Sequence, residues 1–191
     1  MTTRGVIYVH AAPAALTPHL EWAVAGVLDP ESVPDGPPGP DARTFIPPTP
    51  PPAERGHGSA FAWIDQPAEP ATLRAEVAWE GPAGTAGRIA SALRGWPRLR
   101  FEVTEDPSPG NEGERYAWTP RLGMFRATIG VHGDIQIGED HLRAAVAEAI
   151  ADELDLAMQL EELMGQPWDE ELEPFRYAGE GAPVRVLHHV V

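Results

Sequence analysis

A proline-rich stretch is the feature that most limits how this chain folds. Ten prolines fall within the 23 residues from Pro30 to Pro52. Proline has no amide hydrogen to donate to a sheet and it interrupts helices, so neither element is expected there. We predict an extended or disordered insertion over residues 29–59. Its tip, Pro47–Pro52, favours polyproline II, and we interpret it as a surface insertion rather than a ligand for an aromatic groove.

The segments before the insertion predict a strand and a helix. Val6–Val9 is apolar at every position, which is typical of a central strand with both faces covered. Thr17 and Pro18 form a helix start, since threonine can cap and proline at the first helical position loses no hydrogen bond. Apolar residues then follow at helical spacing, so we predict a helix over 18–28.

Three further strands and a second helix follow the insertion. We expect strands at 61–64, at 73–79 and at 99–103, the last two with alternating apolar and polar residues. Thr85 begins a helix that ends before Pro97. The resulting order is β-α-β-β-α-β, which is typical of a ferredoxin-like sheet with its helices on one face. We assign residues 1–106 to this part.

Residues 107–191 read as a C-terminal extension that covers the open face of the sheet. Strands are predicted at 116–119, 124–129, 135–137 and 184–191. A long helix is predicted over 141–164, because apolar residues from Leu142 to Met164 lie on one stripe opposite acidic residues. A short helix is predicted over 168–176. The whole chain, 1–191, is therefore expected to form a single α+β domain.

Composition excludes several classes of chemistry. The chain has no cysteine, which excludes disulfides, thiolate metal sites and cysteine nucleophiles. All 14 basic residues are arginine, which excludes a Schiff-base or phosphate-binding lysine. No apolar run reaches the roughly 20 residues that span a bilayer, and no signal-peptide pattern begins the sequence. We expect a soluble cytoplasmic protein.

Negative charge is concentrated in one region. The formal net charge is −15, and residues 139–180 hold 13 acidic residues against Arg143 and Arg176, a balance of −11. Such a field repels phosphate backbones and anionic lipids, so binding to nucleic acids or membranes is disfavoured. We interpret the region as a solvated helix face, and the alternative is a docking surface for a basic partner.

Familiar catalytic and cofactor motifs are missing. Gly81–Arg88 has the strand-loop-helix setting of a phosphate loop but not its spacing, and we interpret it as a turn with a helix cap. Neither HExxH nor G-x-S-x-G occurs. The acidic residues over 102–114 are expected to form a solvated strand edge and loop. We therefore predict no metal, no cofactor and no catalytic residue.

The segment from Trp168 to Tyr177 combines aromatic, acidic and basic side chains. Trp168 and Phe175 are seven residues apart and share one helix face, so they can pack the helix onto the sheet. The alternative is the lip of a pocket or a partner surface, where Trp, Phe and Arg are enriched. The candidate residues for binding a ligand or partner are His10, Arg115, Tyr116, Trp118, Arg126, Trp168, Phe175 and Arg176.

Several stretches together resemble the actinobacterial family called domain of unknown function 3145. The resemblance covers nearly the whole chain apart from 29–59, and its segments are Arg4–His10, Pro18–Trp22, Leu73–Val77, Gly84–Arg88, Phe101–Gly110, Gly113–Tyr116, Trp168–Arg176 and Pro183–Val191. The resemblance implies an actinobacterial, cytoplasmic protein and assigns no activity or catalytic residue. Members are often encoded near fatty-acid synthesis genes, which implies a role linked to that pathway.

Three functions remain open at this point. The first is a non-catalytic accessory or interaction protein whose partner is a lipid-synthesis enzyme, and it is favoured because no catalytic motif occurs. The second is a binding or sensor domain for acyl-CoA or a related metabolite between the open sheet face and the C-terminal part. The third is an enzyme that uses His10, Glu105 or Arg115 and needs a cleft that holds at least two of these side chains within hydrogen-bonding reach.

Overall fold

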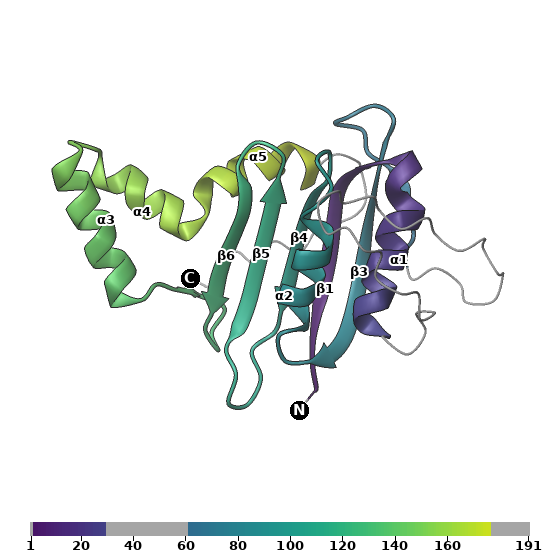
Figure 1. Ribbon diagram of the computed structural model, residues 1–191, viewed down its shortest axis with the longest axis horizontal. Coiled ribbons are helices and arrows are strands. Elements are labelled where there is room, and N and C mark those ends of the chain that lie inside the picture. Colours follow the sequence, from purple (N-terminus) through teal and green to yellow (C-terminus); the bar gives the residue numbers. More distant parts are fainter. Residues whose placement is uncertain (1, 30–60, 177–191) are drawn as a thin grey trace, which may run out of the picture.

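One antiparallel sheet organises the protein. The computed structural model describes residues 2–29 and 61–176. Within these residues seven strands lie in the order β2-β3-β1-β4-β5-β6-β7 (Figure 1). They are β1 (Thr2–Pro13), β2 (Ile64–Asp65), β3 (Thr72–Pro82), β4 (Arg100–Glu105), β5 (Gly113–Thr119), β6 (Gly123–Ile129) and β7 (Ile135–Gln136). The protein belongs to the α+β class that the sequence predicts.

The first strand lies at the centre, as its apolar sequence predicts. β1 pairs with β3 on one side and with β4 on the other. The register shifts after Val9, and His10 has no partner residue in either ladder. His10 lies two positions after Tyr8, which pairs with Glu102, so ordinary alternation points His10 to the face of Glu102. His10 is buried near the end of the strand.

Two helices cover one face of this sheet. The 3₁₀ turn η1 (Ala14–Leu16) leads from β1 into α1 (Thr17–Leu28), and α2 (Thr85–Leu93) connects β3 to β4. Both helices lie over the same face of the sheet (Figure 1). Their apolar side chains share one core with alternate residues of the strands. Its fully buried large members include Ile7, Leu20, Ile89, Leu93 and Phe101.

The opposite face carries the last helix, α5 (Gln166–Arg176). Trp168 and Leu172 pack there against Ala117 and Phe125, in a second and smaller core. Ala117 belongs to this core, whereas its neighbours Tyr116 and Trp118 pack against the first. Because successive strand residues point to opposite faces, α5 covers the face that α1 and α2 leave open (Figure 1).

The prediction of one long helix over 141–164 is wrong. The chain forms α3 (Glu139–Ala151) and α4 (Leu156–Met164), which lie against each other in a hairpin (Figure 1). Glu153 adopts a positive φ of 53°, a left-handed conformation that ends a helix. The carboxylate of Asp155 then accepts from the amide of Ala157 at 2.9 Å and begins the next helix.

The expectation that this helical segment covers the sheet is also wrong. The hairpin projects beyond the β7 edge, and α5 is the one helix of the described residues that crosses the open face (Figure 1). The main contacts of α3 are with α4, and those of α4 are with α3 and α5. Gly165, with a φ of 81°, joins α4 to α5.

Two predicted segments lie outside the described residues. They are almost all of the insertion at 29–59 and the strand at 184–191. The sheet continues without a break from β4 to β5, across the point where the sequence analysis divides 1–106 from 107–191. Among the residues that the structure describes, none forms a helix of the length and apolarity that a bilayer crossing requires.

Candidate functional site

Five ionisable side chains lie together between α5 and the sheet. Glu102 of β4 is at the centre and accepts from three other residues. Asp169 of α5 accepts from both arginines of the group. We call this group the Glu102 cluster, and its members are His10, Glu102, Arg115, Asp169 and Arg176.

The donors reach both oxygens of the Glu102 carboxylate. Arg115 Nη2 and Arg176 Nη2 each lie 2.7 Å from Oε1. Arg176 Nε lies 3.1 Å from Oε2 and His10 Nε2 lies 2.7 Å from the same oxygen. Since an ionised carboxylate only accepts, the Nε2 of His10 carries the hydrogen. Two charge-assisted guanidinium contacts and one imidazole contact therefore satisfy this buried acid.

These contacts keep Glu102 ionised. Burial by itself raises the pKa of a carboxyl group. The hydrogen bond from His10, together with the charges of His10, Arg115 and Arg176, outweighs that effect and holds the pKa of Glu102 well below its usual range. Burial lowers the pKa of Arg115 and Arg176, but the facing carboxylates more than compensate, and both guanidinium pKa values are raised.

The centre of the cluster is buried, and Arg115 and Asp169 at its edge are partly exposed. His10 and Arg176 are each 4% exposed and Glu102 is 6% exposed. Removing charges from water is costly unless each is paired, and here every charge faces an opposite one. These pairings join α5 to the sheet. Among the described residues, no group of three or more side chains has the composition and placement of a metal site.

Other contacts along α5 support the same position. Trp168 Nε1 donates to the Gly123 carbonyl at 3.0 Å, and its ring lies 5.1 Å from the ring of Phe125. The guanidinium of Arg100 lies 4.5 Å from the centre of the Phe175 ring. Gln66 donates to the carbonyls of both His10 and Phe175. Thus the aromatic segment packs over the open face, as one of the two sequence-based interpretations requires.

The eight predicted binding residues do not form one site. Five of them lie at the sheet face that α5 covers. Trp168, Phe175 and Arg176 belong to α5 itself, and His10 and Arg115 lie on the strands beneath it.

The other three predicted residues lie on the opposite face. Tyr116 and Trp118 pack against the core of α1 and α2, and Arg126 lies opposite Tyr116 in the β5–β6 register. Glu114 accepts from Tyr116 at 3.0 Å and from Arg126 at 2.5 Å. Burial, followed by the charge of Glu114, raises the pKa of Tyr116 to about 12.

The expectation that the acidic residues over 102–114 form a solvated edge is wrong for two of them. Glu102 is buried in the cluster, and Glu105 is 4% exposed on the opposite face. There Glu105 accepts from the amides of Gly84 and Ala86 at 2.9 and 3.0 Å, at the start of α2. A helix N-terminus attracts an anion, and the protein's own carboxylate occupies that position.

This placement bears on the enzyme alternative. Glu105 lies in a network separate from the one that holds His10 and Arg115. The enzyme alternative needs at least two of its three side chains within hydrogen-bonding reach of each other. His10 and Arg115 both contact Glu102, whereas Glu105 lies apart from them at the start of α2.

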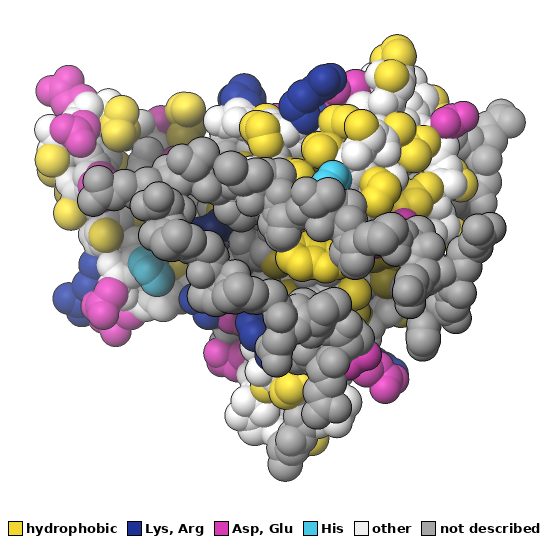
Figure 2. All heavy atoms as spheres, turned by 45° about the vertical axis from the view of Figure 1, so that its right-hand side comes forward, with side chains coloured by type: hydrophobic (Ala, Val, Ile, Leu, Met, Phe, Trp, Pro, Cys, Tyr) yellow, Lys and Arg dark blue, Asp and Glu magenta, His cyan; other side chains and the backbone are white. Residues whose placement is uncertain are grey.

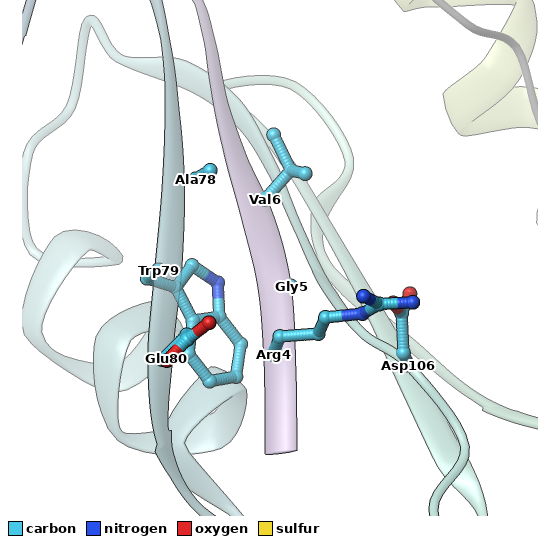
Figure 3. A pocket seen from close by; sticks show the side chains of 7 residues that line it. All are labelled: Arg4, Gly5, Val6, Ala78, Trp79, Glu80 and Asp106. Atoms are coloured by element: carbon cyan, nitrogen blue, oxygen red, sulfur yellow. The ribbon is translucent and has the colours of Figure 1, made fainter.

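A shallow hollow of about 410 Å³ lies on the sheet beside the ends of β1 and β3 (Figure 3). Arg4 reaches across β1 to Asp106, and the two are paired at 3.0 Å (Figure 3). Both side chains are more than half exposed to water. The remaining lining residues are Gly5, Val6, Ala78, Trp79 and Glu80. This hollow lacks the converging buried polar groups that fix a small ligand.

Exposed large apolar side chains are concentrated in the α3–α4 hairpin, which holds seven of the nine that occur among the described residues. Ile150 is 75% exposed and Met158 is 65% exposed. Leu142, Val146, Leu154, Leu156 and Met164 are also exposed, and Figure 2 shows hydrophobic and acidic side chains together at the left edge of the molecule. Contiguous exposed apolar groups with a polar surround are typical of interaction sites.

The hairpin is also the most acidic part of the described structure. Residues 139–164 contain eight acidic residues against Arg143 alone, a balance of −7. Arg143 is already paired with Glu139 on the same helix. The docking interpretation of this acidic region therefore gains support, because a purely solvated face would not carry large apolar side chains.

Comparison with known proteins places the chain in a sequence family. The family described as Protein of unknown function (DUF3145) matches residues 6–36 and 54–189. No curated protein and no solved structure matches the chain. The unmatched residues 37–53 lie within the proline-rich stretch.

Proposed function

The chain belongs to the family described as Protein of unknown function (DUF3145), and we propose that it is a non-catalytic accessory protein that binds another protein through the α3–α4 hairpin. The observation that carries the proposal is the exposure of large apolar side chains on two helices held away from the sheet. Fully burying one such side chain contributes about 1.5–3 kcal/mol, so several together supply the energy of a specific contact.

The way in which the hairpin is held supports this role. α4 continues into α5, and α5 is fixed to the sheet by the Glu102 cluster and by Trp168. The hairpin thus has a rigid base, which lowers the entropy that binding must overcome. A catalytic role has less support, because His10, Glu102, Arg115 and Arg176 are engaged with one another, and the buried Glu105 caps the start of α2.

The first four strands support a finer description of the fold. We propose that residues 1–106 form a ferredoxin-like unit. Their strands lie in the order β2-β3-β1-β4, all neighbours are antiparallel, and both helices pack on one face. This order fits two interleaved β-α-β units. The cytoplasm is the compartment proposed for the protein, and lipid-synthesis enzymes are the first partners to test, as the family resemblance implies.

The test compares partners recovered with three forms of the full chain. Ile150→Asp places a charge on the hairpin. Val131→Asp makes a similar change outside it, and Ile150 and Val131 are both 75% exposed. Tagged wild-type protein and both variants are expressed in the native host, and co-purified proteins are quantified by mass spectrometry. The proposal expects a partner that is retained by wild type and Val131→Asp and is lost with Ile150→Asp.

Two outcomes would contradict the proposal. One is a partner that Ile150→Asp retains in full, because the hairpin would then be dispensable for binding. The other is the absence of any partner shared by wild type and Val131→Asp. Circular dichroism of the purified variants checks that both substitutions leave the fold intact, which is expected at such exposed positions.

A further inference from the structure

The apolar stripe of α3 is only partly covered by α4. Ala145 and Ala149 are the buried residues of α3, whereas Leu142, Val146 and Ile150 are exposed. Residues four apart lie above one another on a helix, so the three large side chains form a ridge beside the alanines. The ridge extends over about 12 Å, at 1.5 Å of rise per residue. A second helix can pack along a ridge of this length.

The connection between the two helices places acids beside this ridge. Three acidic residues, Asp152, Glu153 and Asp155, lie next to the exposed Leu154 and Leu156. All of these residues are exposed, and no basic residue occurs between Arg143 and the end of α4. An occupant of the ridge therefore meets apolar side chains along α3 and uncompensated negative charge at its end.

Charge distinguishes between the possible occupants. A second copy of this chain would bring another hairpin of charge −7 and a whole-chain charge of −15 against the first. Like charges brought together at an interface cost several kcal/mol. An anionic lipid surface meets the same repulsion. A protein helix with an apolar stripe and basic flanks satisfies both the ridge and the acidic connection.

We infer that the hairpin binds a basic amphipathic helix of its partner, which packs along Leu142, Val146 and Ile150 and places arginine or lysine side chains near Asp152, Glu153 and Asp155. This inference rests on the proposed function and adds the chemistry of the partner. The bound helix lies on the flank of α3 that α4 leaves free, so the two proteins together form a bundle of three helices.

Three synthetic peptides of equal length test the inference on the full chain. The first has leucines at helical spacing with arginines beside them, the second replaces the arginines by glutamates, and the third scrambles the first. Fluorescence anisotropy of labelled peptide measures each dissociation constant. The first peptide is expected to bind at least about tenfold more tightly than either of the others. Raising the ionic strength from about 0.05 to about 0.5 M weakens this binding.

Variants of the hairpin locate the binding. Ile150→Asp is expected to lose the first peptide, and Val131→Asp, equally exposed in the native chain, is expected to retain it. Asp152→Asn combined with Glu153→Gln removes two charges but leaves the ridge. This double variant is expected to bind more weakly than wild type and with a smaller dependence on salt.

Other occupants appear as distinct outcomes that overturn the inference. Equal binding of the first and scrambled peptides indicates attraction by charge alone. A concentration-dependent dimer in sedimentation that Ile150→Asp abolishes indicates a second copy. Binding to neutral phosphatidylcholine vesicles indicates a lipid surface. A native partner that needs Ile150 but has no basic amphipathic helix overturns the inference and leaves the proposed function standing.

Discussion

Arg176, the last residue of α5, donates two hydrogen bonds to Glu102 in the middle of β4, 74 positions earlier in the chain. The contacts measure 3.1 and 2.7 Å, and both side chains are buried. This pair joins the end of the described chain to the sheet. It also determines the position from which the α3–α4 hairpin projects, since α4 continues into α5 through Gly165.

Arg176→Met is expected to destabilise the protein strongly. The substitution keeps a long side chain but removes two hydrogen bonds to the buried Glu102 and one to Asp169. Breaking a buried pair in this way costs about 3–5 kcal/mol. Urea unfolding measures the change in the free energy of unfolding. Arg4→Met breaks the exposed pair with Asp106 and is expected to change it by less than about 1 kcal/mol. Similar effects of both substitutions would contradict the role assigned to the cluster.

Glu102 is expected to make stability depend on acidic pH. Its pKa in the folded protein lies well below the ordinary value of 4.5. The unfolded chain therefore binds its proton first as the pH falls, and the stabilisation by Glu102 is complete above the ordinary pKa and is lost below it. Wild type and Glu102→Gln are compared by urea unfolding between neutral and acidic pH. The difference in stability between them is expected to shrink below about pH 4.5, and a constant difference would argue against the ionised form.

Glu105→Ala is expected to loosen the start of α2. The substitution removes the acceptor of the Gly84 and Ala86 amides, and losing a helix cap costs about 0.5–2 kcal/mol. Hydrogen exchange, followed by NMR, should show faster exchange of these two amides than in wild type. Glu76→Ala removes an exposed carboxylate from β3 and is the matched control. Unchanged protection of Gly84 and Ala86 in Glu105→Ala would contradict the capping role.

Gly165→Ala is expected to cost more stability than Gly133→Ala. Both glycines have positive φ, at 81° and 89°, so each alanine carries about 1–2 kcal/mol of backbone strain. At Gly165 a Cβ atom would also lie 2.6 Å from the ring of Phe125, whereas the space at Gly133 is open. The difference in melting temperature between the two variants measures the destabilisation that the steric contact with Phe125 adds to the backbone strain. Equal melting temperatures would show that α4 and α5 can shift away from β6 without cost.

The sequence identifies most strands because their alternation is local. Ala75, Val77 and Trp79 face one core, and the polar residues between them are predicted on the other face. The same rule fails for Glu102, which lies between Phe101 and Val103 and therefore reads as exposed. Only α5, more than 60 residues later, buries it. Neither Arg115 nor Arg176 is close enough in sequence to reveal the cluster.

The sequence pattern does not predict the α3–α4 hairpin, for a different reason. The apolar spacing continues through the break, and residues 152–155 contain neither glycine nor proline. A left-handed Glu153 and the cap at Asp155 divide the helix. The one local signal is a short acidic side chain two residues before Ala157, which is weak evidence against a continuous stripe. The apolar side chains of α3 and α4 are exposed because these helices do not pack on the sheet. A local sequence pattern cannot predict that arrangement.

The separation of the hairpin from both cores has an evolutionary consequence. Neither core contains a residue from 139 to 164, so substitutions, insertions or deletions there alter few of the contacts that hold the sheet together. Under the proposed function, a change of partner requires substitutions within this segment alone and leaves the contacts of both cores intact. A lineage in which Leu142, Val146 and Ile150 vary together would mark a change of partner.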